Sequence, residues 1–166
     1  MRKILCVLSV FFLLAGVCQS QETKELKSLC RSYFNQNRND SEFLDIKGGM
    51  IKLARNMMPR KSRKVMDMMH PKSMFHFTAG KGDSEAFQTF LSEANKLLSA
   101  GSFVAVKSES SEQPEEKNTP VKWFIVEDGD YITDLVMVSE QEENIAIFSI
   151  NGRMSKSDAR EIGKKP

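Results

Sequence analysis

The chain has 166 residues, of which 40% are hydrophobic and 28% charged, and its formal net charge is +2. This length suits one domain with a hydrophobic core of its own. Residues 1–20 carry Arg2 and Lys3 and no acidic residue, so the remainder holds equal numbers of basic and acidic residues. A net charge of zero removes the argument for nucleic-acid binding that the basic full-length chain would otherwise give.

The first twenty residues have the pattern of a secretory signal peptide. Two basic residues precede an apolar run over residues 4–15, and small residues then lead to Gln21. The run is shorter than the roughly 20 residues that a transmembrane helix needs. We therefore expect an exported protein, periplasmic or secreted, with cleavage after Ser20. Lipid attachment at Cys18 is a less favoured alternative, because Val17 stands where lipoprotein processing requires a small side chain.

Residues 21–40 are predicted to form an N-terminal helix and a linker. Apolar side chains recur there at helical spacing, namely at Leu26, Leu29, Cys30, Tyr33 and Phe34. Once the signal peptide has left with Cys6 and Cys18, Cys30 has no partner for a disulfide within the chain. We expect Cys30 to be a buried apolar residue rather than a reactive thiol.

A single domain is predicted over residues 41–163, and residues 164–166 are expected to fray. Its first part alternates helical and extended patterns, which Pro59, Gly101 and other breakers separate. The expected order is strand 41–47, helix 50–58, helix 62–69, strand 73–78, helix 84–100 and strand 103–107. Residues 108–119 are rich in Ser, Glu and Pro and are expected to form a loop.

Three apolar runs of strand length follow Pro120, at residues 121–126, 131–138 and 144–150. They are rich in β-branched and aromatic residues, as strands are. Asp128-Gly129 between the first two supplies the positive φ that a tight hairpin requires. These runs predict an antiparallel meander, and a short capped helix is expected after it, from Ser155 through Ile162.

The predicted fold class is therefore α+β. The sheet is expected to be mainly antiparallel and to contain the C-terminal three-stranded meander plus one or two further strands. The amphipathic helices are expected to pack on one face of this sheet, because each presents a single apolar stripe.

The order of these parts resembles a known family. The helix before Pro59, the amphipathic helix after Asp83, the strand pair around Glu127-Asp128-Gly129 and the closing segment 145–152 with its short helix are similar to an exported Bacteroidota family catalogued as domain of unknown function 4252. The similarity covers roughly residues 41–163. It implies a small α+β protein of the cell envelope, and it implies no activity and no site residues.

No catalytic signature is apparent in the sequence. The histidines are His70 and His76, and the chain lacks a Gly-x-Ser-x-Gly elbow, a His-Glu-x-x-His motif and a phosphate-binding Gly-rich loop. Paired carboxylates such as Asp128 and Asp130 fall in a predicted turn. We therefore expect a non-enzymatic protein that needs no cofactor.

The leading functional hypothesis is an interaction or accessory module of the cell envelope, with an envelope protein as its partner. A basic segment over residues 52–64 is one expected contact surface, and any uncovered sheet edge is another. The candidate partner-binding residues are Arg60, Lys61, Arg63 and Lys64. An acidic partner or an anionic lipid surface would complement this segment, although a solvated basic face explains it equally simply.

Periplasmic metal binding is the alternative hypothesis. Seven of the ten methionines lie between Met50 and His76, together with both histidines. Thioether and imidazole groups select monovalent copper, whereas methionine also fills apolar cores, and core packing is the favoured explanation. If copper binds, the candidate ligands are Met66, Met69, His70 and Met74.

Overall fold

The computed structural model describes residues 21–57, 60–80, 84–106, 121–141 and 144–163. The predicted signal peptide, the loop over 108–119 and the tail over 164–166 lie outside the described residues. The elements are α2 (Gln21–Gln36), β1 (Ser41–Lys47), α3 (Gly49–Met57), α4 (Arg60–Met69), β2 (Ser73–Gly80), α5 (Ser84–Ser99), β3 (Phe103–Val106), β4 (Val121–Asp128), β5 (Tyr131–Gln141), β6 (Asn144–Ser155) and α6 (Lys156–Gly163).

Six strands form one sheet in the order β1-β2-β6-β5-β4-β3, and every pair of neighbours is antiparallel. The predicted meander β4-β5-β6 is confirmed, and three strands rather than one or two accompany it. In its first hairpin Asp128 pairs with Tyr131, so Gly129 takes the first loop position, with a φ of 56°. The α+β class with a mainly antiparallel sheet is confirmed.

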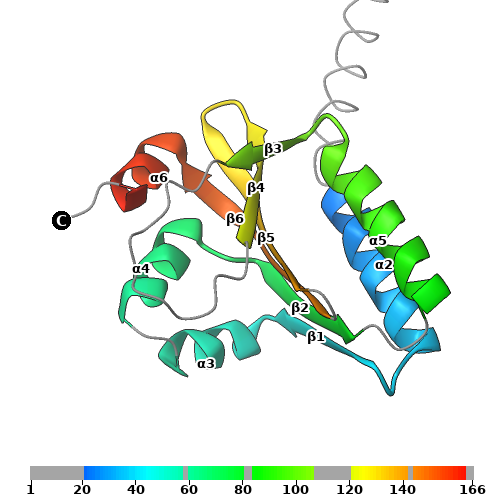
Figure 1. The fold of residues 1–166 in the computed structure, drawn as a ribbon. Coiled ribbons are helices and arrows are strands. Elements are labelled where there is room, and N and C mark those ends of the chain that lie inside the picture. The colour runs from blue at the N-terminus through cyan, green and yellow to red at the C-terminus, as the bar shows by residue number, and fades with distance from the viewer. Residues whose placement is uncertain (1–20, 58–59, 81–83, 107–120, 142–143, 164–166) are drawn as a thin grey trace, which may run out of the picture.

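The first face of the sheet is covered by α2 and α5, which lie side by side (Figure 1). Their apolar stripes meet the inward side chains of the strands in an aromatic-rich core, where the Phe77 ring lies 6.1 Å from Tyr33 and 5.1 Å from Phe90 between centroids. Cys30 is fully buried in this core, as the sequence predicted. The N-terminal helix α2 thus shares one core with the sheet.

The second face is covered by α3, α4 and α6 (Figure 1). Met66, Met69 and Met74 pack there with Ile132, Ile150 and Met154. The expectation that the helices pack on one face is therefore corrected. Helices must cover both faces because the consecutive β2 residues Met74 and Phe75 are both buried and point to opposite faces.

The absence of a side chain at Gly152 lets the end of α4 approach β6. A Cβ atom at this position would clash with the carbonyl oxygen of Met69 and would lie 3.1 Å from that of His70. His70, which directly follows α4, has a φ of 44° and is the single non-glycine residue with a positive φ in the described part of the chain. Contact between backbones, rather than between side chains alone, therefore fixes α4 on the second face.

The register of the central strands shifts twice beside Gly152. It shifts between Val126 and Glu127 where β4 pairs with β5, and between Ile132 and Asp134 where β5 pairs with β6. As a result Ile132 packs in the second core, although strict alternation from Val136 would place it on the first face. Irregular pairing of this kind bends strands and redirects side chains.

Candidate functional site

A hollow of about 460 Å³ opens on the first face, where the apolar core ends beneath the start of α2. We call it the Asp134 hollow. Most of its lining side chains are polar, and they come from α2, from the strands β1, β2, β4, β5 and β6, and from the residue before β2. The lining residues are Thr23, Lys24, Lys27, Lys47, Lys72, Ser73, Phe75, Asp128, Thr133, Asp134, Ser149, Asn151 and Gly152.

A polar row across four strands forms the floor of the hollow. Lys47 pairs with Ser73, Ser73 pairs with Asn151, and Asn151 pairs with Asp134. Facing partners in a sheet point to the same side, so these four side chains share the first face. In the next row toward the core, Phe75 pairs with Ser149, which in turn pairs with Val136.

Asp134 is fully buried at the centre of this floor. Asn151 donates a hydrogen bond of 2.9 Å from Nδ2 to Asp134 Oδ1. Burial raises the pKa of the Asp134 carboxyl, and polar contacts with Asn151, Thr133 and Thr23, together with the charge of Lys24, offset only part of this effect. The carboxyl therefore holds its proton more tightly than an exposed aspartate does.

Three buried polar atoms of the hollow make no hydrogen bond of standard geometry within the described residues, although Thr23 lies close enough to the Asp134 carboxyl to lower its pKa. They are Thr23 Oγ1, Ser149 Oγ and Asp134 Oδ2. Buried polar groups are rarely left unsatisfied, because each one costs free energy in the absence of a partner. The floor of the hollow is therefore prepared for hydrogen bonds that the described part of the protein does not make with itself.

Four lysines from three segments surround this floor. Lys24 and Lys27 come from α2, Lys47 ends β1, and Lys72 lies just before β2. Lys24 and Lys72 are exposed, and no ion pair involves either of them within the described residues. Two ammonium groups are thus available to a negatively charged group at the mouth of the hollow.

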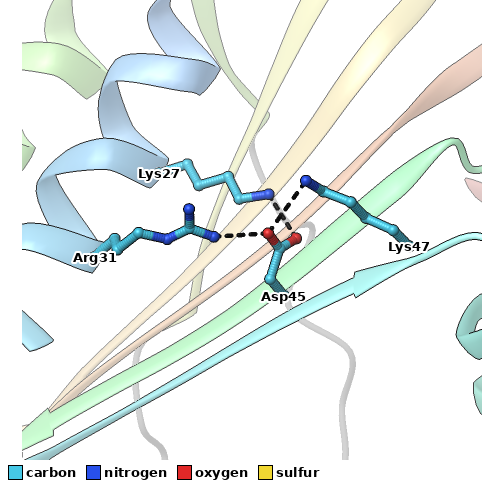
Figure 2. A network of polar contacts seen from close by, with 4 residues as sticks. All are labelled: Lys27, Arg31, Asp45 and Lys47. Carbon is cyan, nitrogen blue, oxygen red and sulfur yellow. Dashed lines mark hydrogen bonds and ion pairs between the residues drawn. The ribbon is translucent and has the colours of Figure 1, made fainter.

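The other two lysines pair with Asp45, which also pairs with Arg31 (Figure 2). Asp45 accepts ion pairs from Lys27 at 2.6 Å, Arg31 at 2.7 Å and Lys47 at 3.4 Å. Partial burial alone would raise the pKa of the Asp45 carboxyl, but the hydrogen bonds and charges of Lys27 and Lys47 lower it below its usual value. This network ties α2 to β1 and holds one side of the hollow in place.

The side chains that line the hollow are mostly lysines, hydroxyl groups and carboxyl groups. Lysines and orphaned hydroxyl groups recognise anions and hydrogen-bonding groups. Within the described residues, no group of three or more His, Cys, Asp or Glu side chains is placed to hold a metal ion. Cys30 lies in the first core rather than in the hollow lining, and burial raises the pKa of its thiol.

The copper candidates are only partly brought together. Met66, Met69 and Met74 lie in the second core and are each at most 2% exposed, whereas His70 is exposed at the end of α4. The three thioethers share their surroundings with isoleucine side chains. The fourth candidate ligand thus lies in solvent while the other three are packed in apolar contact. Copper binding at these residues stays a prediction.

The candidate partner-binding residues all belong to α4. Arg63 donates a hydrogen bond of 3.1 Å from Nη2 to the carbonyl oxygen of Asn56, and Lys64 is exposed. The side chains of Arg60 and Lys61 lie outside what the structure describes. These residues are on the second-face side of the molecule, away from the Asp134 hollow on the first face.

The sequence analysis did not identify the Asp134 hollow. One signal was present, because Asp134 shares the alternation of Val136 and Val138 and so stands at a position where the strand is expected to be apolar. The lysines gave no such signal, since they are scattered from residue 24 to residue 72 and only the packing of α2 on the sheet brings them together.

Comparison with known proteins identifies a family. The family model described as "Domain of unknown function (DUF4252)" matches residues 33–162. No curated protein and no solved structure matches the chain. The comparisons thus identify no catalytic family. Among the helices of the described residues, none combines the length and the apolar composition of a membrane-spanning segment.

Proposed function

Since the chain belongs to the family of domains of unknown function DUF4252, we propose that it is an exported, non-enzymatic accessory module of the cell envelope that binds an acidic segment of a partner protein in the Asp134 hollow. Export is supported by the signal-peptide pattern over residues 1–20. The module would act in the periplasm or be secreted, and it would need no cofactor.

One observation carries the binding proposal. Lys24 and Lys72, which have no ion pair in the described part of the chain, stand at a hollow that contains three buried polar atoms without a hydrogen bond of standard geometry. A carboxylate of the partner would pair with the two ammonium groups. Backbone or side-chain groups beside that carboxylate would bond to Ser149, Thr23 and Asp134.

A protein segment fits this hollow better than a small apolar ligand does. The lining is mostly charged and polar, and Phe75 is its single aromatic residue. Small-molecule sites are usually lined by apolar and aromatic side chains that bury most of the ligand. An open, basic hollow instead suits the tip of an acidic segment whose remaining contacts lie outside it.

The test is crosslinking in the native host, followed by capture of the tagged protein from the envelope fraction and mass spectrometry of what is captured with it. We expect a stoichiometric partner. The double variant Lys24→Glu and Lys72→Glu should reduce its recovery about tenfold or more, because two attractive contacts become repulsive. The matched control is charge reversal at Arg38 and Lys96, exposed residues that do not line the hollow.

The same experiment separates the hollow from the basic segment of α4. Charge reversal at Arg60, Lys61, Arg63 and Lys64 should leave recovery of the partner unchanged if the hollow is the binding site. Loss of the partner in this variant alone would move the interaction to α4. Equal recovery in all variants would reject charge recognition at both places.

A further inference from the structure

Only some of the apolar side chains of α3 pack into the second core, and the others are exposed. Met50, Leu53 and Met57 are 50%, 65% and 87% exposed, although Ile51 and Ala54 of the same helix pack into the second core. Their spacing of three and four residues places the three exposed side chains along one stripe of the helix. We call Met50, Leu53 and Met57 the α3 stripe.

An exposed apolar side chain also occurs on β1, the strand that α3 contacts. α3 contacts β1, whose Leu44 is 49% exposed. Leu44 pairs with His76, which pairs with Phe148, and Phe148 packs against the second core. Leu44 therefore faces the same side of the sheet as α3. Exposed apolar side chains that gather on one side of a protein are typical of an interaction site.

The surroundings of the α3 stripe are basic. Residues 46–66 contain seven basic residues and no acidic one, and the first acidic residue after them is Asp67, which forms an ion pair with Arg55. Lys52 on α3 and Lys64 on α4 are exposed, and α3 contacts α4. An apolar stripe and exposed basic side chains thus occur on the same pair of neighbouring helices.

From this combination we infer that α3 lies on the surface of an anionic lipid bilayer. The α3 stripe enters the boundary between headgroups and acyl chains, while Lys52 and Lys64 meet lipid phosphates. Short helices that join an apolar face to a basic one bind membranes in this orientation. This inference does not depend on the Asp134 hollow, which lies on the opposite face of the sheet.

Charge and side-chain chemistry favour a bilayer over a second copy of this chain. Two copies that met through α3 would bring two basic surfaces together, which is unfavourable. Unbranched methionine side chains adapt to irregular apolar surroundings, so they suit a fluid acyl boundary that offers no fixed pocket. A bilayer also needs no shape complementarity, and a nine-residue helix offers little of it.

The test is co-sedimentation with lipid vesicles, using the chain that begins at Gln21, because the apolar run over residues 4–15 would itself bind lipid. Vesicles of phosphatidylcholine with phosphatidylglycerol are compared with vesicles of phosphatidylcholine alone. We expect binding to the anionic vesicles only. Raising the salt concentration from about 0.05 M to about 0.5 M should weaken this binding about tenfold or more, since salt screens the lysine contacts.

The decisive variant is Leu53→Glu with Met57→Glu, which should weaken vesicle binding about tenfold or more by placing two acids at the anionic surface. Its matched control is Val104→Glu with Val106→Glu on β3, where the side chains are 47% and 43% exposed. Circular dichroism and thermal unfolding establish that both variants fold. The control should bind vesicles like the unchanged chain.

Three results would overturn the inference. The first is that the unchanged chain fails to bind anionic vesicles at low salt. The second is that the two double variants bind these vesicles equally well. In the third, sedimentation equilibrium shows a dimer of the unchanged chain that Leu53→Glu with Met57→Glu dissociates, which would assign the α3 stripe to a second copy of the chain.

Discussion

On the first face of the sheet the core is built mainly from aromatic rings under two long helices, whereas on the second face methionine and isoleucine side chains fill the space under three shorter helices. The rings of Tyr33, Phe77 and Phe90 are in mutual contact. Aromatic side chains are stiff and contribute large areas, while methionine adapts its shape to its neighbours.

The two faces also differ in the surface that they present to solvent. The first face carries the Asp134 hollow, which contains a buried carboxyl group and buried hydroxyl groups. The second face is covered in part by α3, which exposes apolar side chains as well as basic ones. The first surface suits recognition of defined groups, and the second suits contact with a fluid surface.

The largest effect is expected from truncation in the aromatic core. Phe77→Ala should lower the free energy of unfolding by about 3–5 kcal/mol, because Phe77 is fully buried between Tyr33 and Phe90. Urea unfolding followed by circular dichroism measures this loss. On the second face, Met74→Leu should cost less than about 1.5 kcal/mol, since the volume is nearly conserved. Equal losses would erase the contrast between the two cores.

A smaller effect is expected where the two backbones touch. Gly152→Ala should lower the free energy of unfolding by about 1–3 kcal/mol, because the new Cβ would meet the Met69 carbonyl oxygen and α4 must move away. Gly101→Ala is the matched control, since a Cβ there meets no atom within 4 Å. Hydrogen exchange should show faster opening of α4 in the Gly152 variant. A pair of unchanged stabilities would contradict the close approach.

Removal of the buried charge should stabilise the protein at neutral pH. Asp134→Asn keeps a polar group opposite Asn151 and no longer requires a charge to be buried, so we expect a gain of about 1 kcal/mol. Because the folded-state pKa of Asp134 is raised, the folded chain keeps a proton that the unfolded chain has already released.

The raised pKa of Asp134 determines how the stability of the protein changes with pH. Stability contributed by protonated Asp134 is fully present below the ordinary aspartate pKa of 3.8 and is lost as the pH rises through the raised value. The advantage of Asp134→Asn should therefore grow with pH over that window and become constant above it. Denaturant titrations at several pH values measure this difference. An advantage that shrinks with rising pH would mean that the charged form is stabilised.

The smallest effect is expected at the edge of the hollow. Asp45→Asn should cost about 1 kcal/mol or less, because Lys27, Arg31 and Lys47 pair with Asp45 near solvent. Since the pKa of Asp45 is lowered, its contribution is present above the ordinary aspartate value and is lost as the pH falls through the lowered one. The cost should also shrink in high salt. A loss that salt leaves unchanged would point to packing rather than charge.

Most of the secondary structure could be predicted from the sequence, because its signals are local. The hairpin at Gly129, the capping of α6 by Ser155 and the apolar stripe of α5 each depend on residues a few positions apart. Ser155 Oγ accepts a hydrogen bond of 3.1 Å from the Asp158 backbone, as the predicted cap requires. The α+β class with its antiparallel meander follows from these signals.

The candidate site could not be predicted in the same way. Sequence reasoning selected Met66, Met69 and Met74 by their composition, and the tertiary structure placed them in the second core. It passed over Asp134, although the alternation with Val136 and Val138 places this aspartate at a position where the strand is expected to be apolar. Burial depends on which helix covers the strand, and that is decided by long-range packing.

The sequence by itself determined where helices and strands begin, that the sheet is antiparallel around Gly129, and that Cys30 would be buried. Only the tertiary structure decided which face each helix covers and which lysines meet at Asp134. The physical reason is the sequence separation of the interacting residues, because turn geometry and periodicity involve only near neighbours in the chain. The position of α2 over the floor, the register shifts beside Asp134 and the contact at Gly152 depend on atoms that are distant in sequence.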